Sequence, residues 1–121
     1  MGTVDIDAVA EHAGAYGFAY LITITPHQRV HTSVVHPEFT DHVVTVPGAS
    51  DRARTNAAAH ADVSLVWPPA DETGYSLIVD GIADGQNAAA LRIVPSRAIL
   101  HRPAVEPGPA GAGCVQDCIE L

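Results

Sequence analysis

The stretch PGASDRARTNAAAHADVSLVW, residues Pro47–Trp67, predicts a loop, a short helix and a buried strand. Ser50 is expected to be the N-cap residue of the helix, with Asp51 in the first turn and an alanine run behind it. The β-branched, apolar run Val63–Trp67 predicts the strand that follows. The segments on either side predict further strands, so this unit anchors a mainly β fold.

The start of the same helix is a candidate anion site. Basic and hydrogen-bonding residues gather there: Ser50, Arg52, Arg54, Thr55 and Asn56. A helix start offers unpaired N–H groups and the positive end of the helix dipole, and guanidinium groups add charge-assisted donors, so the pattern favours a phosphate. The alternative is a solvated surface helix whose arginines pair with Asp51 and Asp62.

Outside this stretch, the chain predicts one more helix, over Val4–Tyr16, and several short strands. Turns are expected at Pro26–Gln28 and at Pro37–Asp41. The strands are expected at residues 18–25, 29–36, 42–46, 63–67, 75–83 and 89–94, with 96–101 as an extension of the last. Six short strands at hairpin spacing with two short helices predict a small antiparallel barrel.

The composition limits the partners. The chain has 121 residues and a formal net charge of −8, and its six basic residues are all arginine, which argues against nucleic acid or an anionic membrane surface as a partner. No apolar run approaches the roughly 18 residues that cross a bilayer, and no secretion signal is evident. We therefore expect a cytoplasmic protein.

Two regions are expected along the chain. Residues 1–104 form the barrel domain, and residues 105–121 form a flexible tail that is rich in Pro, Gly and Ala. Both cysteines, Cys114 and Cys118, lie in this tail at C-x3-C spacing, which is neither the redox C-x-x-C pattern nor a strong zinc pattern.

The order of these elements resembles the pyridoxamine 5′-phosphate oxidase-like split-barrel family, which includes flavin- and deazaflavin-dependent oxidoreductases. The resemblance spans roughly Val9–Pro103 and is carried by four words, FAYLITITPHQRVHTSVVHP, RARTNAAA, DVSLVW and YSLIVDGIA. It implies a six-stranded Greek-key split β-barrel of the FMN-binding type. It also implies a homodimer that holds FMN or the deazaflavin coenzyme F-420 in grooves between its subunits.

The resemblance assigns the cofactor phosphate to the loop and helix that carry Ser50, Arg52, Arg54 and Thr55 here, and it gives Asn56 a structural role. Many relatives use a lysine in this helix, and this chain has none. By strand alternation, further groove-lining candidates are Tyr20, Thr23, His31, Ser33 and Trp67, although Tyr20 and Trp67 also suit a core.

Other chemistries find less support. His31 and His36 are five residues apart on one strand, so they point to opposite faces, and no carboxylate stands at ligand spacing, so no metal site is predicted. The chain lacks a G-x-S-x-G elbow, which disfavours a hydrolase. A flavin carries the hydride itself, so no catalytic side chain is required.

Three functions stay open on the sequence. The first is an oxidoreductase that uses FMN or F-420 to reduce a small organic substrate. The second is a non-catalytic split barrel that binds a flavin, haem or a related anion. The third is a thiol- or metal-handling protein that acts through Cys114 and Cys118.

Overall fold

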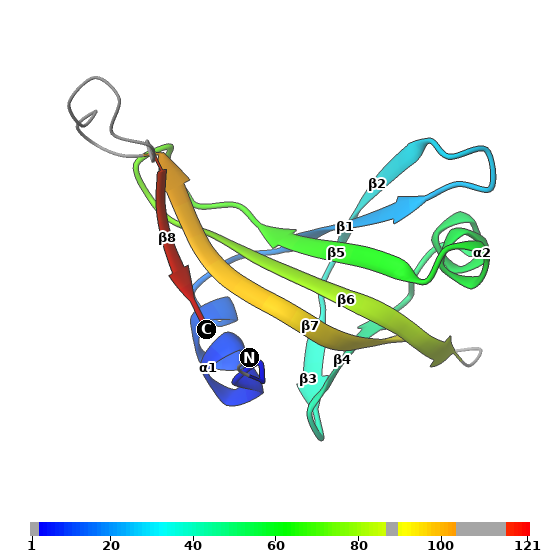
Figure 1. The fold of residues 1–121 in the computed structure, drawn as a ribbon, viewed down its shortest axis with the longest axis horizontal. Coiled ribbons are helices and arrows are strands. Elements are labelled where there is room, and N and C mark those ends of the chain that lie inside the picture. The colour runs from blue at the N-terminus through cyan, green and yellow to red at the C-terminus, as the bar shows by residue number, and fades with distance from the viewer. Residues whose placement is uncertain (1–2, 87–89, 104–115) are drawn as a thin grey trace.

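The structure, a computed structural model, describes residues 3–86, 90–103 and 116–121. These residues form two helices and eight strands (Figure 1). In chain order they are α1 (Ile6–Ala13), β1 (Ala19–Ile24), β2 (Val30–Val35), β3 (Glu38–Thr40), β4 (Val43–Pro47), α2 (Asp51–Ala59), β5 (Asp62–Trp67), β6 (Ser76–Gln86), β7 (Ala90–Pro103) and β8 (Gln116–Glu120).

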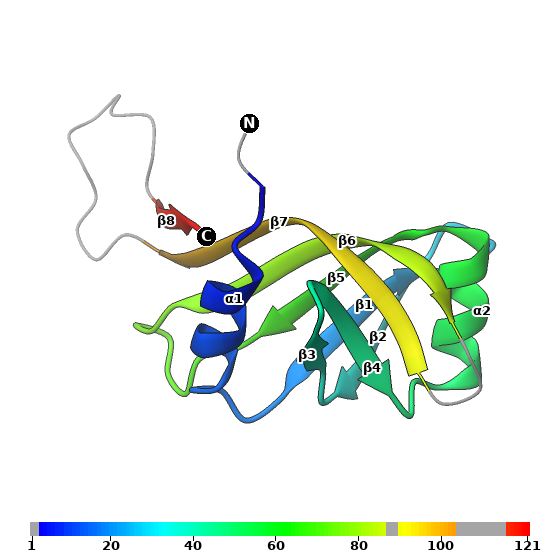
Figure 2. The same ribbon diagram turned by 90° about the horizontal axis from the view of Figure 1, so that it is seen from below.

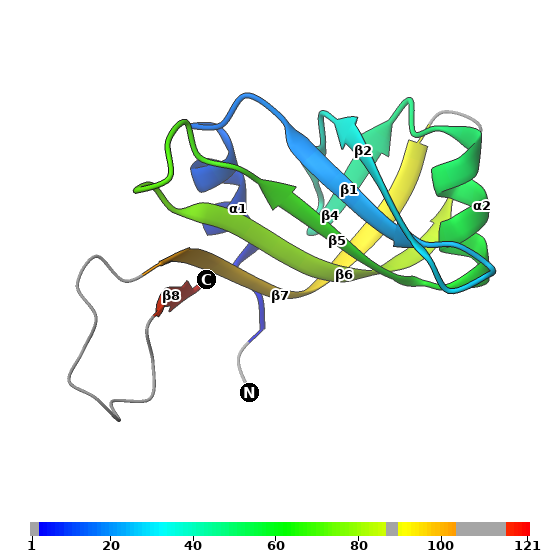
Figure 3. The same cartoon turned by 90° about the horizontal axis from the view of Figure 1, so that it is seen from above.

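All eight strands belong to one antiparallel sheet in the order β2-β1-β5-β6-β7-β4-β3, with β8 beside β7. The sheet curls on itself into a half-barrel (Figures 2 and 3). The predicted mainly β, antiparallel, curled architecture with two helices is confirmed. The strand count is wrong, because six strands were expected and the described residues form eight.

One additional strand comes from the segment that was expected to be a turn at Pro37–Asp41. Glu38–Thr40 pairs with β4, and the turn lies one step later, at Asp41 and His42. Both residues have positive φ, 48° and 68°, which is the backbone of a two-residue type I′ hairpin loop. His42, expected to begin a strand, therefore lies in the turn.

The other additional strand lies in the expected tail. Gln116–Glu120 pairs with the second half of β7, from Ile99↔Glu120 to Pro103↔Gln116. These backbone pairings differ from the expectation of a tail without fixed structure. Cys118 lies in β8, exposed and free, whereas Cys114 and the proposed domain boundary at residue 104 lie outside the described residues.

The two segments expected at residues 89–94 and 96–101 form one strand, β7, which bends at a bulge. Asp80 pairs with Arg97 and Gly81 pairs with Pro95, so Ser96 is an extra residue on β7. A bulge tolerates Pro95, which has no amide hydrogen for the ladder. At Gly81 a side chain is excluded, because a Cβ would lie 2.6 Å from a side-chain carbon of Ile93.

The core fills the inner face of the curled sheet and is closed by the two helices. The alternating strand residues Leu21, Leu65, Leu77 and Val79 are almost fully buried there. Helix α1 adds Ile6, Val9 and Ala13, and α2 adds Ala53 and Ala57. In all three views the two helices lie apart along the long axis, with strands between them.

A candidate anion site at the start of α2

The start of α2 has the local structure that the sequence predicts. Ser50 is the N-cap: its Oγ accepts the amide of Ala53 at 3.1 Å, and its carbonyl accepts the amide of Arg54 at 3.0 Å. The amides of Asp51 and Arg52 complete the first turn, where a helix has no internal acceptors for its N–H groups. These two amides and the positive end of the dipole are what the backbone offers to an anion.

One side of α2 faces a shallow surface hollow of about 440 Å³. Asp51, Arg54, Thr55 and Ala58 line it, as residues spaced by three and four do on a helix. Arg52 is exposed and projects from another side of the helix, because positions two apart do not face each other. The hollow thus joins a guanidinium and a hydroxyl with the carboxylate of Asp51, which opposes the binding of a phosphate.

Asn56 holds the helix in place. It is buried, with 2% of its surface exposed, and its Nδ2 donates to Thr23 Oγ1 on β1 at 3.1 Å. Thr23 is also buried, so this hydrogen bond lies away from water. Asn56 is therefore placed to tie α2 to the sheet.

Two predicted residues on β2 face inward beside this tie. His31 lies opposite Thr23 and Ser33 lies opposite Leu21 on β1, and directly opposite residues of an antiparallel pair project from the same face. His31 Nδ1 and Ser33 Oγ are buried, and within the described parts of the chain neither atom has a hydrogen-bond partner. Buried polar atoms normally have a hydrogen-bond partner, so these two atoms suit the polar edge of a ligand or of another chain.

Two other predicted residues lie elsewhere. Trp67 is buried near the end of α1, where its ring stacks on Phe39 with the centroids 5.9 Å apart. Tyr20 is opposite Val34 and so lies on the outer face of the sheet, and its ring meets Phe18 edge-on at 5.3 Å. The structure therefore groups Arg54 with Thr55 and His31 with Ser33, and it places Trp67 and Tyr20 apart from the α2 hollow.

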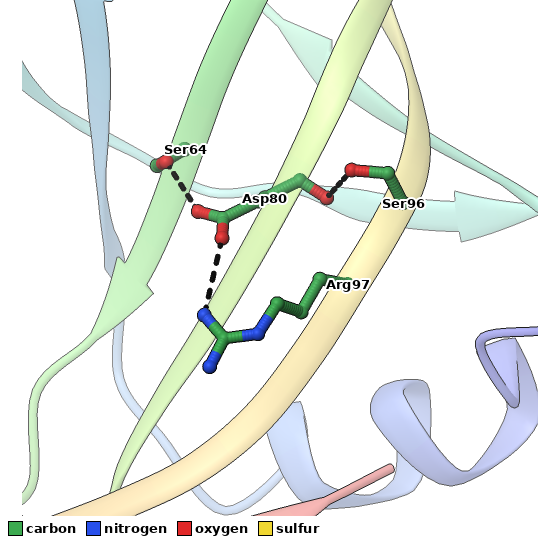
Figure 4. A network of polar contacts seen from close by, with 4 residues as sticks. All are labelled: Ser64, Asp80, Ser96 and Arg97. Atoms are coloured by element: carbon green, nitrogen blue, oxygen red, sulfur yellow. Dashed lines mark hydrogen bonds and ion pairs between the residues drawn. The ribbon is translucent and has the colours of Figure 1, made fainter. Parts of the chain in front are cut away.

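A polar network on the outer face of the sheet was not predicted from the sequence (Figure 4). Ser64 Oγ donates to Asp80 Oδ1 at 2.6 Å, Arg97 Nη1 lies 3.6 Å from Asp80 Oδ2, and Ser96 Oγ donates to the carbonyl of Asp80 at 3.2 Å. The apolar side chains of Ile22 and Ile24 on β1 line a hollow of about 290 Å³ together with Ser64, Asp80 and Ser96. The network depends on the bulge, which turns Ser96 toward Asp80.

Among residues 3–86, 90–103 and 116–121, no three side chains of His, Cys, Asp or Glu gather as ligands for a metal ion. None of the helices in that part of the chain has the length and apolarity to cross a membrane.

The residues at α2 fit the phosphate of a flavin or deazaflavin cofactor. Arg54 and the first-turn amides are donors on the side of the hollow, and Arg52 adds positive charge from another side of the helix. His31 Nδ1 and Ser33 Oγ, which have no hydrogen-bond partner among the described residues, fit further polar atoms of such a molecule.

Comparison with known proteins finds close relatives in sequence. An uncharacterized protein of Mycobacterium bovis and an uncharacterized protein of Mycobacterium tuberculosis are each 42% identical over 132 residues. Each match covers 96% of this chain and 93% of the relative. No family profile matches the chain.

Solved structures resemble the fold at low identity. A putative pyridoxamine 5′-phosphate oxidase from Listeria innocua has a TM-score of 0.63 at 11% identity, over 78% of this chain and 96% of that one. A heme binding protein from Mycobacterium smegmatis scores 0.62 at 12% identity, over 99% and 59%. An F420 reductase scores 0.56 at 13% identity, over 67% and 87%. Likeness at these identities shows the fold.

Proposed function

The chain belongs to the family of these two mycobacterial proteins and has the split-barrel fold of the pyridoxamine 5′-phosphate oxidase-like proteins, and from this premise we propose that it is an oxidoreductase. It would use FMN or coenzyme F-420 to reduce a small organic substrate. The observation that carries the proposal is the capped start of α2, with two arginines in a chain that has only six basic residues. The solved folds that resemble the chain include an F420 reductase.

Each residue at the site has a distinct part in this proposal. A bound flavin or deazaflavin supplies the hydride chemistry. Arg54 and the first-turn amides bind the phosphate, and Arg52 adds positive charge from another side of the helix, while Asp51 weakens that binding through like-charge repulsion. Asn56 holds α2 at a fixed height above β1 through Thr23. His31 and Ser33 donate to or accept from the polar edge of the bound molecule.

We also propose that the protein is a homodimer through the outer face of the sheet. Apolar side chains are exposed there, including Val30 at 72% and Val34 at 58% on the edge strand β2. Exposed apolar patches mark interaction sites, and a two-fold dimer buries the same patch on both subunits. Light scattering that finds only a 12.6 kDa species at micromolar concentration contradicts the dimer.

The alternative function is a non-catalytic module that binds a flavin or haem. It is favoured by the likeness to a heme binding protein that spans 99% of this chain. The absorption spectrum separates the two: a protein that binds haemin with a sharp Soret band, and shows no response to FMN or F-420, has the alternative function.

The experiment that tests the phosphate site replaces both Arg52 and Arg54 with Gln and measures FMN and F-420 binding by titration calorimetry. A charge-assisted hydrogen bond from Arg54 is worth on the order of 1.5–3 kcal/mol, so affinity falls at least roughly tenfold to hundredfold in the double variant. Neither side chain belongs to the core, so the fold is retained. Arg29→Gln, in the β1–β2 turn, is the matched control and leaves the affinity unchanged. Equal binding by the double variant and the parent contradicts the phosphate site.

A further inference from the structure

A second hollow lies away from α2, beside α1, and aromatic side chains form its walls. Its volume is about 290 Å³, and it lies between the end of α1, the segment from β2 to β3 and the end of β5. Four of the six aromatic residues in the chain line it: Tyr16, Phe18, Phe39 and Trp67. We call it the aromatic pocket.

The walls of the aromatic pocket are fixed in position. Trp67 is 3% exposed and stacks on Phe39 with an angle of 23° between the rings. The hydroxyl of Tyr16 donates to the carbonyl of Tyr75 at 2.7 Å, which anchors the Tyr16 ring on another segment. Tyr16, Phe18 and Phe39 are only half-buried, so part of each residue remains accessible to a ligand.

The α1 side of the pocket is kept open by small residues. Ala10, Gly14 and Gly17 line it, and a Cβ built on Gly17 finds no atom within 4 Å. His36, which is exposed, stands among the lining residues and brings an imidazole that donates or accepts a hydrogen bond. Rigid aromatic walls, open space and one convergent polar group are the features of a small-molecule site.

We propose that the aromatic pocket binds a planar ring molecule of one or two fused rings that carries an oxygen acceptor for His36. The volume of about 290 Å³ lies just below the range of about 300–1,000 Å³ for ligand sites, which favours a small ring system over a larger one. Offset-stacked and edge-on contacts with Tyr16, Phe18 and Phe39 favour an aromatic ring over an aliphatic chain. The site is separate from the α2 hollow, and binding does not require a flavin.

The single tryptophan of the chain lies in this pocket and reports its occupancy. The probe is 4-nitroanisole, a planar nitroaromatic that quenches tryptophan emission and does not react with the thiols of the protein. Titrated into the full chain without added flavin, it is expected to quench Trp67 saturably, with a midpoint on the order of 1 mM or below. The Trp67 indole N–H resonance is expected to shift over the same range.

Three variants locate the binding. Ala10→Leu puts a leucine into the pocket from a helix that tolerates it, and raises the midpoint at least about tenfold. Ala8→Leu makes the same change on α1 outside the pocket and leaves the midpoint unchanged. His36→Ala removes one hydrogen bond and raises the midpoint about two- to tenfold. Circular dichroism on each variant verifies that the fold is retained.

Two results overturn the proposal. One is quenching of the parent that rises linearly without saturation, as free collision gives, while the indole resonance stays in place. The other is equal saturation in Ala10→Leu and Ala8→Leu. Because no flavin is present, the proposed function can fail while this site stands, and the reverse also holds.

Discussion

The hydrogen bond between Asn56 and Thr23 is the contact through which we expect α2 to be positioned, and a double-mutant cycle measures it. Asn56→Leu leaves Thr23 Oγ1, in a side chain that is 1% exposed, without its donor. Thr23→Val leaves the side-chain amide of Asn56 without its acceptor. An unsatisfied buried polar group costs about 1–3 kcal/mol, so each single variant should lose that much stability.

The double variant carries the sharper expectation. It replaces both partners by apolar groups, which can be nearly neutral, so its loss should be no larger than that of either single variant alone. Urea unfolding of the four proteins gives the free energies. Each kcal/mol corresponds to about 3–6 °C in Tm for a chain of this size. Single losses that add to within about 0.3–0.5 kcal/mol in the double variant would refute a coupled, buried contact.

Three further changes probe the site and the fold. Asp51→Asn removes a carboxylate from the α2 hollow and should raise affinity for FMN about two- to tenfold by calorimetry, whereas Asp62→Asn, the same charge change outside the hollow, should leave it unchanged. Burial raises the pKa of the Tyr16 hydroxyl above its ordinary value of 10.0. The neutral hydroxyl therefore contributes fully to stability below pH 10.0, and this contribution is lost as the pH rises through the raised pKa. Tyr16→Phe should cost about 0.5–1.5 kcal/mol near neutral pH and should lack this alkaline loss in pH-dependent unfolding. Gly81→Ala should cost about 1–3 kcal/mol or more, because its Cβ meets β7 at 2.6 and 2.7 Å, while Gly17→Ala, with open space around it, should change the urea midpoint little.

Local patterns in the sequence carried much of the fold. The Ser50 cap, the helix behind it and the alternation that places His31 and Ser33 on one face of β2 follow from residue types at short spacing, whereas which face turns inward does not. The strand β3 was missed because three residues between Pro37 and a turn give no period to read. The strand β8 was missed because its pairing with β7, more than a dozen residues upstream, leaves no period to read in the five residues QDCIE.

The parts of the site that the sequence did not yield depend on register between strands. Ser64 meets Asp80 only because β5 and β6 pair in one particular register, and Ser96 meets the same residue only through the bulge. The aromatic pocket likewise joins Tyr16, Phe39 and Trp67 from three separate segments. Each of these residue types is ordinary in isolation, so no local sequence motif predicts these contacts.

The assignment of the α2 start to a flavin or deazaflavin site is tested by the absorption spectrum of the purified protein, followed by titration with FMN and with F-420. The expected result is a flavin-type spectrum as purified, or saturable binding of at least one of the two cofactors with micromolar affinity. A colourless protein that responds to neither cofactor at concentrations on the order of 1 mM would contradict it.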